Sequence, residues 1–220
     1  MRTFRGDAVS GKKGMTLVEL LVVISIAGII SAVLFANYPA YDENKKLLIA
    51  AEEVALTLRE AQVFGLSVRS DDPSAPMQTF SGRYGININT VTRPNDITLF
   101  VDNGTGVYEE GTDLKDMAST ITLASPISLK AICFNANGQS PASGGVEECN
   151  TSGGVVGWRS RVATVLFERP NPEPSIKTGL GQAQQYLRII LTNGRIDRNI
   201  YVWASGQIAV TDPSDVIYIP

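Results

Sequence analysis

Hydrophobic and polar residues divide the chain into an apolar run near the N-terminus, an amphipathic run, and a region of short apolar segments. Residues 20–41 contain no charge and are rich in Leu, Val, Ile and Ala. A helix of this length spans a hydrocarbon layer of about 30 Å. The chain therefore contains a segment with the length and composition of a transmembrane helix.

The helical period continues beyond Asp42. Apolar residues follow at alternating intervals of four and three positions, while charged residues occupy the other faces; the apolar set is Leu47, Ala51, Val54, Leu58, Ala61 and Gly65. This spacing predicts an amphipathic helix with one packing stripe. Burial of the stripe against an attached sheet is favoured over an independent surface helix or a coiled-coil strand, because three heptads make only a short coiled coil.

Together the two runs predict one helix over residues 20–69, about 75 Å long at 1.5 Å per residue. Pro39 interrupts it. Because proline removes one intrahelical hydrogen-bond donor, we expect a kink or local melting there.

The region after the helix is predicted to form β-strands. Turn-forming residues Asp71, Asp72 and Pro73 predict the helix end. Strand-like runs follow, separated by Gly, Asn, Asp and Pro, at residues 83–88, 96–101, 119–123, 128–135, 161–168, 185–192, 198–204 and 206–211. The last two predict a hairpin. The expected fold class is α+β, with a long N-terminal helix packed on a C-terminal antiparallel β-sheet domain.

The charge distribution predicts how the apolar run is oriented in the membrane. The 220 residues carry a net charge of -3, but residues 1–14 carry +3 and the remainder -6. Positive charge precedes the apolar run, and Asp42 and Glu43 follow it. The positive-inside rule therefore predicts a cytoplasmic N-terminus and an extracytoplasmic domain after residue 41. An acidic body is a poor general binder of nucleic acid.

Composition argues against catalysis. The chain contains no histidine, which removes the commonest general base and the commonest zinc ligand. The Ser10-x-x-Lys13 pattern and the glycines at 179 and 181 lack the strand and helix context of an acyl-transfer site or a nucleotide site. We expect no enzyme, no cofactor and no metal, since a hydrolase on a membrane stalk needs a catalytic cluster that the sequence does not display.

The start of the apolar run holds the most specific signal. An ordinary secretory signal ends in small residues, which residues 34–38 lack. Instead, Gly14 directly follows a basic cluster, and Glu19 lies five residues later inside the apolar start. A carboxylate near the centre of a membrane helix costs roughly 2.5–3.5 kcal/mol, and less near an end, so it is usually functional. The alternative is an interfacial residue at the membrane edge.

The run Gly14-Met15-Thr16-Leu17-Val18-Glu19 resembles the signal of type IV prepilins and type II secretion pseudopilins, with Met15 where Phe is commonest. The resemblance implies that a prepilin peptidase cuts after Gly14 and methylates the amine of Met15. It also implies that Glu19 pairs with the N-terminal amine of a neighbouring subunit and is recognised by the inner-membrane assembly machinery. An ammonium partner offsets the cost of a buried carboxylate.

Three short runs are also informative: Leu58-Arg59-Glu60-Ala61-Gln62 near the helix end, Tyr84-Gly85-Ile86, and Thr192-Asn193-Gly194-Arg195 near the C-terminal strands. With them, the whole layout is similar to that of pseudopilin H and FimT-like minor pilins. The resemblance implies a leader at 1–14, a transmembrane and assembly half of the helix at 15–41, an amphipathic half at 42–70 and an extracytoplasmic domain at 71–220. It also implies a structural subunit of a type IV pilus or a type II secretion pseudopilus, with other subunits and the lipid bilayer as partners. In this family a proline is common at the position of Ala36, so Pro39 is displaced by three residues.

The alternative function is a membrane-anchored extracytoplasmic binding module, for example a minor pilin that takes up DNA. Its only local candidates are Arg188, Arg195 and Arg198. Acidic residues nearby dilute their positive field, namely Asp197, Asp212 and Asp215.

Two further features have structural interpretations. Cys133 and Cys149 lie in polar, glycine-rich surroundings typical of a surface loop, and in an exported domain we expect them to form a disulfide worth roughly 3 kcal/mol; the alternative is two free thiols. Residues 102–113 loosely resemble a calcium loop, but Gly104 and Gly106 stand where ligands are needed and Val107 replaces the central glycine. A hairpin loop with an acidic surface is favoured there.

Overall fold

The computed structural model describes residues 14–67, 82–115, 120–135, 147–151, 161–179, 181 and 183–213. The chain forms two compact units, Met1–Asp42 and Glu43–Pro220. One helix and twelve strands make up the described structure.

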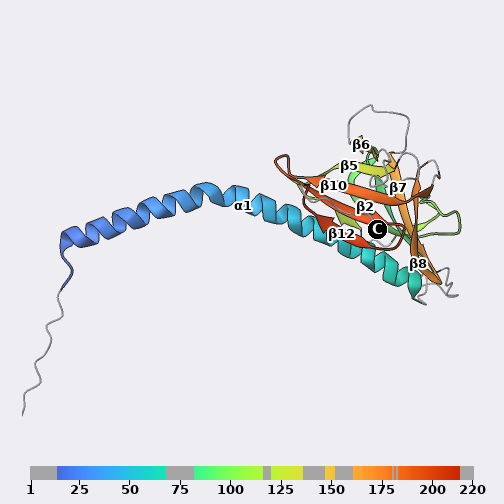
Figure 1. Ribbon diagram of the computed structural model, residues 1–220, viewed down its shortest axis with the longest axis horizontal. Helices are drawn as coiled ribbons and strands as arrows, with labels where there is room; N and C mark the ends of the chain where they lie inside the picture. Colours follow the sequence, from blue (N-terminus) through green and yellow to red (C-terminus); the bar gives the residue numbers. More distant parts are fainter. Residues whose placement is uncertain are drawn as a thin grey trace, which may run out of the picture. The chain divides into compact units, whose positions relative to one another are not determined.

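Helix α1 (Leu17–Leu66) has 50 residues and includes both predicted runs (Figure 1). The backbone stays helical through position 39, so the expectation of local melting at Pro39 is wrong, and a kink there stays a prediction. The helix ends at Leu66, before the predicted end at residue 69, and residues 71–73 lie outside the described part of the chain. Ser67 closes the last turn, because its N–H donates to the Val63 carbonyl at 2.9 Å.

The first unit consists of the apolar part of α1. Leu17–Phe35 has a mean hydropathy of 2.7, and none of its residues is buried by the part of the chain that the structure describes. It is the one helical segment in the described structure whose length and composition allow it to cross a membrane. These properties are consistent with a single-pass membrane protein.

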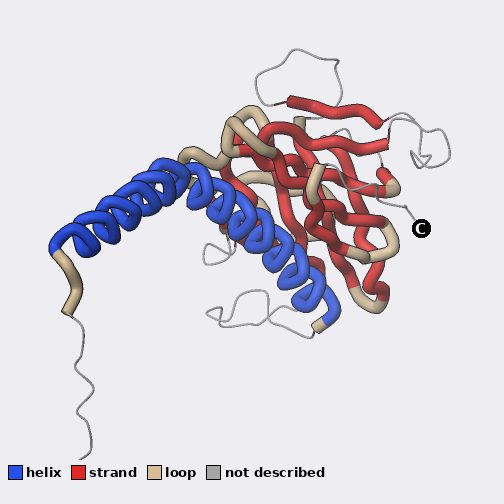
Figure 2. Tube along the Cα trace, turned by 60° about the vertical axis from the view of Figure 1, so that its left-hand side comes forward, coloured by secondary structure: helices blue, strands red, loops and turns tan. Residues whose placement is uncertain are grey.

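The second unit contains two antiparallel sheets (Figure 2). The first has the order β3-β2-β1-β7-β8-β9, and β4 also pairs with β2. Its strands are β1 (Arg83–Asn89), β2 (Arg93–Val101), β3 (Leu114–Lys115), β4 (Ile121–Thr122), β7 (Val162–Glu168), β8 (Asn171–Thr178) and β9 (Ala183–Gln184).

The second sheet has the order β12-β11-β10-β5-β6. Its strands are β5 (Ser128–Asn135), β6 (Glu147–Thr151), β10 (Tyr186–Thr192), β11 (Asp197–Trp203) and β12 (Ile208–Thr211). The predicted hairpin joins β11 to β12, where Gly206 adopts a φ of 84° and its N–H donates to the Trp203 carbonyl at 2.9 Å. Glycine suits this turn because it enters the left-handed region without steric cost.

The predicted packing stripe on the second half of α1 is buried and joins one hydrophobic core with both sheets. The side chains of Leu47, Ala51, Val54, Leu58 and Ala61 are fully buried. Phe64 packs edge-on against Tyr84 of β1, with ring centroids 5.6 Å apart. The α+β class is therefore confirmed, whereas the division of the strands into two sheets was not predicted.

Strand β8 was missed by the sequence analysis because Pro172 and Pro174 discourage a strand assignment. Proline is tolerated where a ladder hydrogen bond is absent. The ladder between β7 and β8 is irregular near these prolines, and β9 pairs only with Ile176 and Lys177. Both prolines therefore lie where β8 lacks a partner strand on its β9 side.

A close approach of α1 to β7 yields a stability prediction. A Cβ added to Gly65 would lie 2.6 Å from the Phe167 carbonyl oxygen and 2.7 Å from its Cβ. Alanine normally stabilises a helix by about 1 kcal/mol relative to glycine. We expect Gly65→Ala instead to lower the free energy of unfolding by roughly 1–3 kcal/mol through overpacking. Urea unfolding of the detergent-solubilised chain measures this, with the exposed Glu53→Ala as control; a more stable Gly65→Ala variant would refute the close packing.

Candidate functional site

A residue of the motif caps the N-terminus of α1. The Thr16 hydroxyl oxygen accepts a hydrogen bond from the Glu19 backbone N–H at 3.2 Å, and the Thr16 carbonyl accepts one from Leu20 at 3.1 Å. Thr16 is thus the N-cap, and Glu19 stands at the third helical position, the spacing of a capping box. This cap was not predicted, although Thr followed by Glu three residues later is a recognisable cap signal in the sequence.

The structure places Gly14 and Met15 before the helix, with both residues exposed. A Cβ on Gly14 would meet no atom within 4 Å. Glu19 is exposed in the first helical turn, where the positive end of the helix dipole favours a carboxylate. The Gly14–Met15 bond therefore lies outside the helix, just before the N-cap residue Thr16.

Residues 9–35 match the family described as the prokaryotic N-terminal methylation motif. The chain carries the N-terminal motif of type IV prepilin-like proteins. The matched segment contains the three residues expected to act in processing and assembly: Gly14, Met15 and Glu19. Because the match ends at residue 35, the narrower resemblance to pseudopilin H and FimT-like minor pilins stays a prediction. No solved structure matches the chain.

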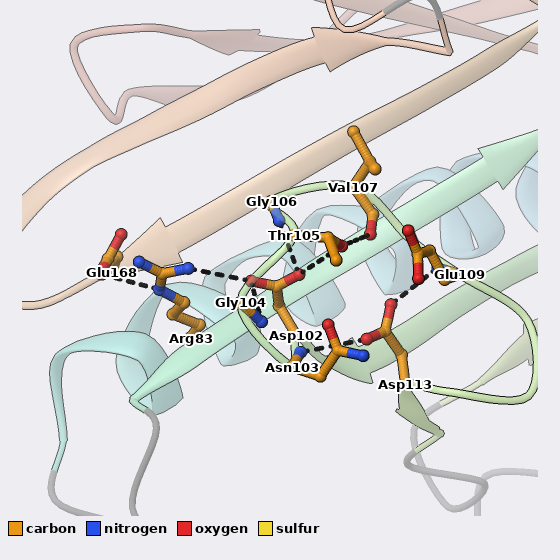
Figure 3. Close-up of polar contacts among 10 residues, drawn as sticks. All are labelled: Arg83, Asp102, Asn103, Gly104, Thr105, Gly106, Val107, Glu109, Asp113 and Glu168. Atoms are coloured by element: carbon orange, nitrogen blue, oxygen red, sulfur yellow. Dashed lines mark hydrogen bonds and ion pairs between the residues drawn. The ribbon is translucent and has the colours of Figure 1, made fainter.

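The acidic loop of this prepilin-like protein, residues 102–113, folds around its own carboxylates (Figure 3). Asp102 is fully buried. It accepts hydrogen bonds from the backbone N–H groups of Gly104 at 3.1 Å and Gly106 at 2.9 Å. Asp113 accepts from the N–H groups of Asn103 at 3.0 Å and Glu109 at 2.7 Å. Both carboxylates thus stabilise the loop by accepting hydrogen bonds from its own backbone N–H groups.

Arg83, on β1, forms ion pairs with Asp102 of this loop and with Glu168. Its guanidinium lies 3.4 Å from Asp102 and donates to Glu168 at 2.7 Å (Figure 3). The hydrogen bond to Glu168 raises the pKa of Arg83 against the opposing effect of desolvation, and Asp102 adds to the rise. A calcium loop would turn its first and last carboxylates toward one cation. In this loop they bind N–H donors and a guanidinium instead, which favours a structural role.

The cysteines are joined as Cys133–Cys149, directly opposite each other on β5 and β6. Cys133 is fully buried inside β5, so the expectation of a surface-loop setting is wrong, whereas the expected disulfide is present. The bond attaches the edge strand β6 to the sheet. Glu147 completes the one Cys/His/acid cluster among the described residues that is compact enough for a metal. Its carboxylate already binds Arg188 and accepts a hydrogen bond from Tyr186.

The three arginines considered for DNA binding are each paired with an acid. Arg188 binds Glu147, Arg198 binds Asp212, and Arg195 lies 3.5 Å from Glu43 on α1. Asp215 lies outside the described residues. Pairing neutralises most of the positive field that phosphates require. The nearby pair of Tyr201 and Trp203 is stacked, with ring centroids 5.4 Å apart.

The acidic loop provides a test that separates anchoring from metal binding. Asp102→Asn replaces an acceptor oxygen with an N–H₂ group facing other donors. We expect it to lower the free energy of unfolding by about 2 kcal/mol, the scale of a buried, unsatisfied polar group. Thermal unfolding measures the effect, with the exposed Glu110→Gln as control.

The same experiment is repeated with millimolar calcium. Anchoring predicts no change in the melting temperature of the unaltered chain. A rise in that temperature, abolished by Asp102→Asn, would show that the loop binds calcium.

Proposed function

We propose that this protein is a structural subunit, a minor pilin or pseudopilin, of a type IV pilus or type II secretion pseudopilus. It is first held in the membrane by α1, with the N-terminus in the cytoplasm and residues 71–220 outside. After processing it enters the filament through this helix. The observation that carries the proposal is the arrangement at the helix start, where an exposed Gly14–Met15 bond, a capping Thr16 and Glu19 lie in sequence within the matched motif.

The proposed processing step fits the local structure. A prepilin peptidase cuts after Gly14 and methylates the new amine of Met15. The bond lies outside the helix, in exposed chain, where a peptidase can bind it without unwinding helical turns. Because the N-cap is Thr16, cleavage leaves the hydrogen bonds at the helix start intact. Met15 then carries the terminal ammonium directly before the cap.

Glu19 is the proposed assembly contact. Its backbone N–H is occupied by Thr16, and its side chain is exposed on an otherwise apolar helical surface. In hydrocarbon a lone carboxylate is costly. A neighbouring subunit offers the ammonium of Met15, which neutralises the charge and also satisfies the hydrogen-bonding capacity of the carboxylate.

The remaining features support an extracytoplasmic, non-enzymatic domain. Prepilin-like proteins of this motif family are structural. The disulfide between Cys133 and Cys149 suits an oxidising compartment outside the cytoplasm. The proposed partners are the peptidase, other pilin or pseudopilin subunits, the inner-membrane assembly machinery and the bilayer. The alternative of a DNA-binding module is disfavoured because Arg188, Arg195 and Arg198 all face acids.

Replacing Glu19 separates the two roles that the structure allows for it. If the only role of Glu19 were in the capping box, the Glu19→Gln variant would behave like the unaltered protein, because glutamine can make the same capping hydrogen bond. If its charge pairs with an ammonium, Glu19→Gln and Glu19→Ala both fail. We expect both variants to insert and lose their leader normally but to fall at least tenfold in the sheared filament fraction, measured by immunoblot.

Thr16→Ala provides the control, since it removes the cap and keeps the charge. We expect it to enter filaments better than Glu19→Gln does. Normal incorporation of Glu19→Gln would exclude the charge-pairing mechanism.

A further inference from the structure

A pocket opens in the second unit beside the turn that joins β10 to β11. Its volume of about 630 Å³ lies within the range of roughly 300–1,000 Å³ found for small-molecule sites. The described lining contains no residue of the processing motif, the acidic loop or the disulfide. It combines charges of both signs with apolar side chains, and includes Lys130, Arg195, Asp197, Asp212, Ile196 and Pro213.

The turn is attached to the first residues of the second unit. The Asn193 side-chain amide donates a hydrogen bond to the Asn44 Oδ1 atom at 3.2 Å, and Arg195 lies 3.5 Å from Glu43. Glu43 comes two residues after Tyr41, the last residue of the charge-free run, which is about 3 Å of helical rise. The headgroup layer of a bilayer is about 5–7 Å deep on each side. In a membrane-anchored chain, the pocket is therefore within reach of lipid headgroups.

We propose that this pocket, the turn pocket, binds the zwitterionic headgroup of a phospholipid, in which a phosphate is joined to an ammonium group as in phosphatidylethanolamine. Lys130 and Arg195 supply the cations for the phosphate. Asp197 and Asp212 supply the carboxylates for the ammonium. The inference rests on the proposed function for one point only, the anchoring of the chain in a membrane.

The charge balance of the turn pocket selects a zwitterion. The three cations at or beside the pocket are each matched by an acid, in the pairs Lys130–Asp197, Arg195–Glu43 and Arg198–Asp212. A balanced set of charges has little net field to attract a purely anionic ligand. A zwitterion adds one charge of each sign and keeps the balance. The same pairing that disfavours DNA therefore suits this ligand.

The charged side chains have capacity for a second partner. The side chains of Lys130, Arg195 and Asp212 are 50%, 62% and 51% exposed. An ammonium group has three donors, a guanidinium has five, and a carboxylate accepts about four hydrogen bonds. One ion pair uses only part of that capacity. Because surface ion pairs contribute little to stability, sharing their charges with a ligand costs little.

The wall of the turn pocket is already formed without a ligand. The Asn193 side-chain oxygen accepts hydrogen bonds from the backbone N–H groups of Arg195 at 3.0 Å and Ile196 at 2.9 Å. The Thr192 hydroxyl donates to the Ile196 carbonyl at 3.1 Å and accepts from the Gly194 N–H at 3.1 Å. A preformed wall lowers the entropic cost of binding. Ile196 and Pro213 offer apolar surface to the CH₂ groups of the headgroup.

Native mass spectrometry tests the turn pocket directly. The full chain is placed in nanodiscs that contain equal amounts of phosphatidylethanolamine and phosphatidylglycerol with the same acyl chains. The lipids that stay bound to the released protein are then identified by mass. We expect phosphatidylethanolamine to be retained at least fivefold more than phosphatidylglycerol.

Two variants alter the turn pocket in different ways. Lys130→Gln removes a partner of the phosphate, and we expect it to lower the retention of phosphatidylethanolamine at least fivefold. Asp212→Asn removes a partner of the ammonium and leaves one extra positive charge, so the preference should shift toward phosphatidylglycerol. Arg93→Gln, which breaks an exposed ion pair with Glu110 elsewhere in the second unit, is the control and should change neither value. Thermal unfolding checks that each variant is folded.

Each contrary outcome has its own meaning. Equal retention of the two lipids, or retention that neither variant changes, would overturn the turn pocket as a headgroup site. A preference of the unaltered chain for phosphatidylglycerol would overturn the choice of a zwitterion. Equal binding of soluble glycerophosphoethanolamine and of the lipid, at the same concentration in detergent, would overturn the membrane as the source of the ligand.

These results leave the proposed function standing, because the nanodisc experiment requires neither cleavage nor filament assembly. A chain that fails to insert into nanodiscs would contradict the membrane anchor, and with it both proposals.

Discussion

The structure depends on one helix whose two halves need different surroundings. Along Leu17–Phe35, α1 is predominantly apolar, and no other residue that the structure describes buries it. Along its second half, one stripe is fully buried in the core of a two-sheet domain. Apolar surface left in water is unfavourable by about 25 cal/mol per Å². The first half of α1 is therefore stable only where an apolar environment, such as lipid, surrounds it.

This constraint explains why the charged and polar features of the helix lie where they do. Thr16 caps the helix two residues after Gly14, so under the proposed processing the helix start would not depend on the residues removed. Glu19 is the one charge within Leu17–Phe35, and the proposed assembly step would pair it with an ammonium from another subunit. In the second half, the charged residues lie on the other faces and leave the packing stripe free to pack on the sheets. Each half thus has a surface for a different neighbour.

The sequence predicted those parts of the fold that depend on local spacing. The stripe from Leu47 to Gly65 was read correctly because a helix imposes its own period, and β5 was predicted with its observed bounds because its apolar run is bounded by turn residues. The division into two sheets was not predictable, since it depends on pairings such as β5 with β10 that join distant parts of the chain. β8 was missed because its prolines act against the usual strand pattern.

In the candidate sites, too, features set by local spacing were predicted, and features set by contacts between distant residues were not. The spacing of Gly14, Met15 and Glu19 is a local pattern, and it lies within the matched family segment. The disulfide was expected from the compartment, but its place across β5 and β6 needed the register. The pairing of Arg188 with Glu147 and of Arg195 with Glu43 could not be read from the sequence, because the partners are far apart along the chain. Those pairs changed the interpretation of the arginines.

The most direct test of the account is the mass of the N-terminal peptide of the protein recovered from its native membrane or filament. The account predicts that the chain begins at Met15 and that its α-amine carries a methyl group, about 14 Da above the unmodified peptide. A chain that still begins at Met1, or one that begins beyond Phe35, would contradict it.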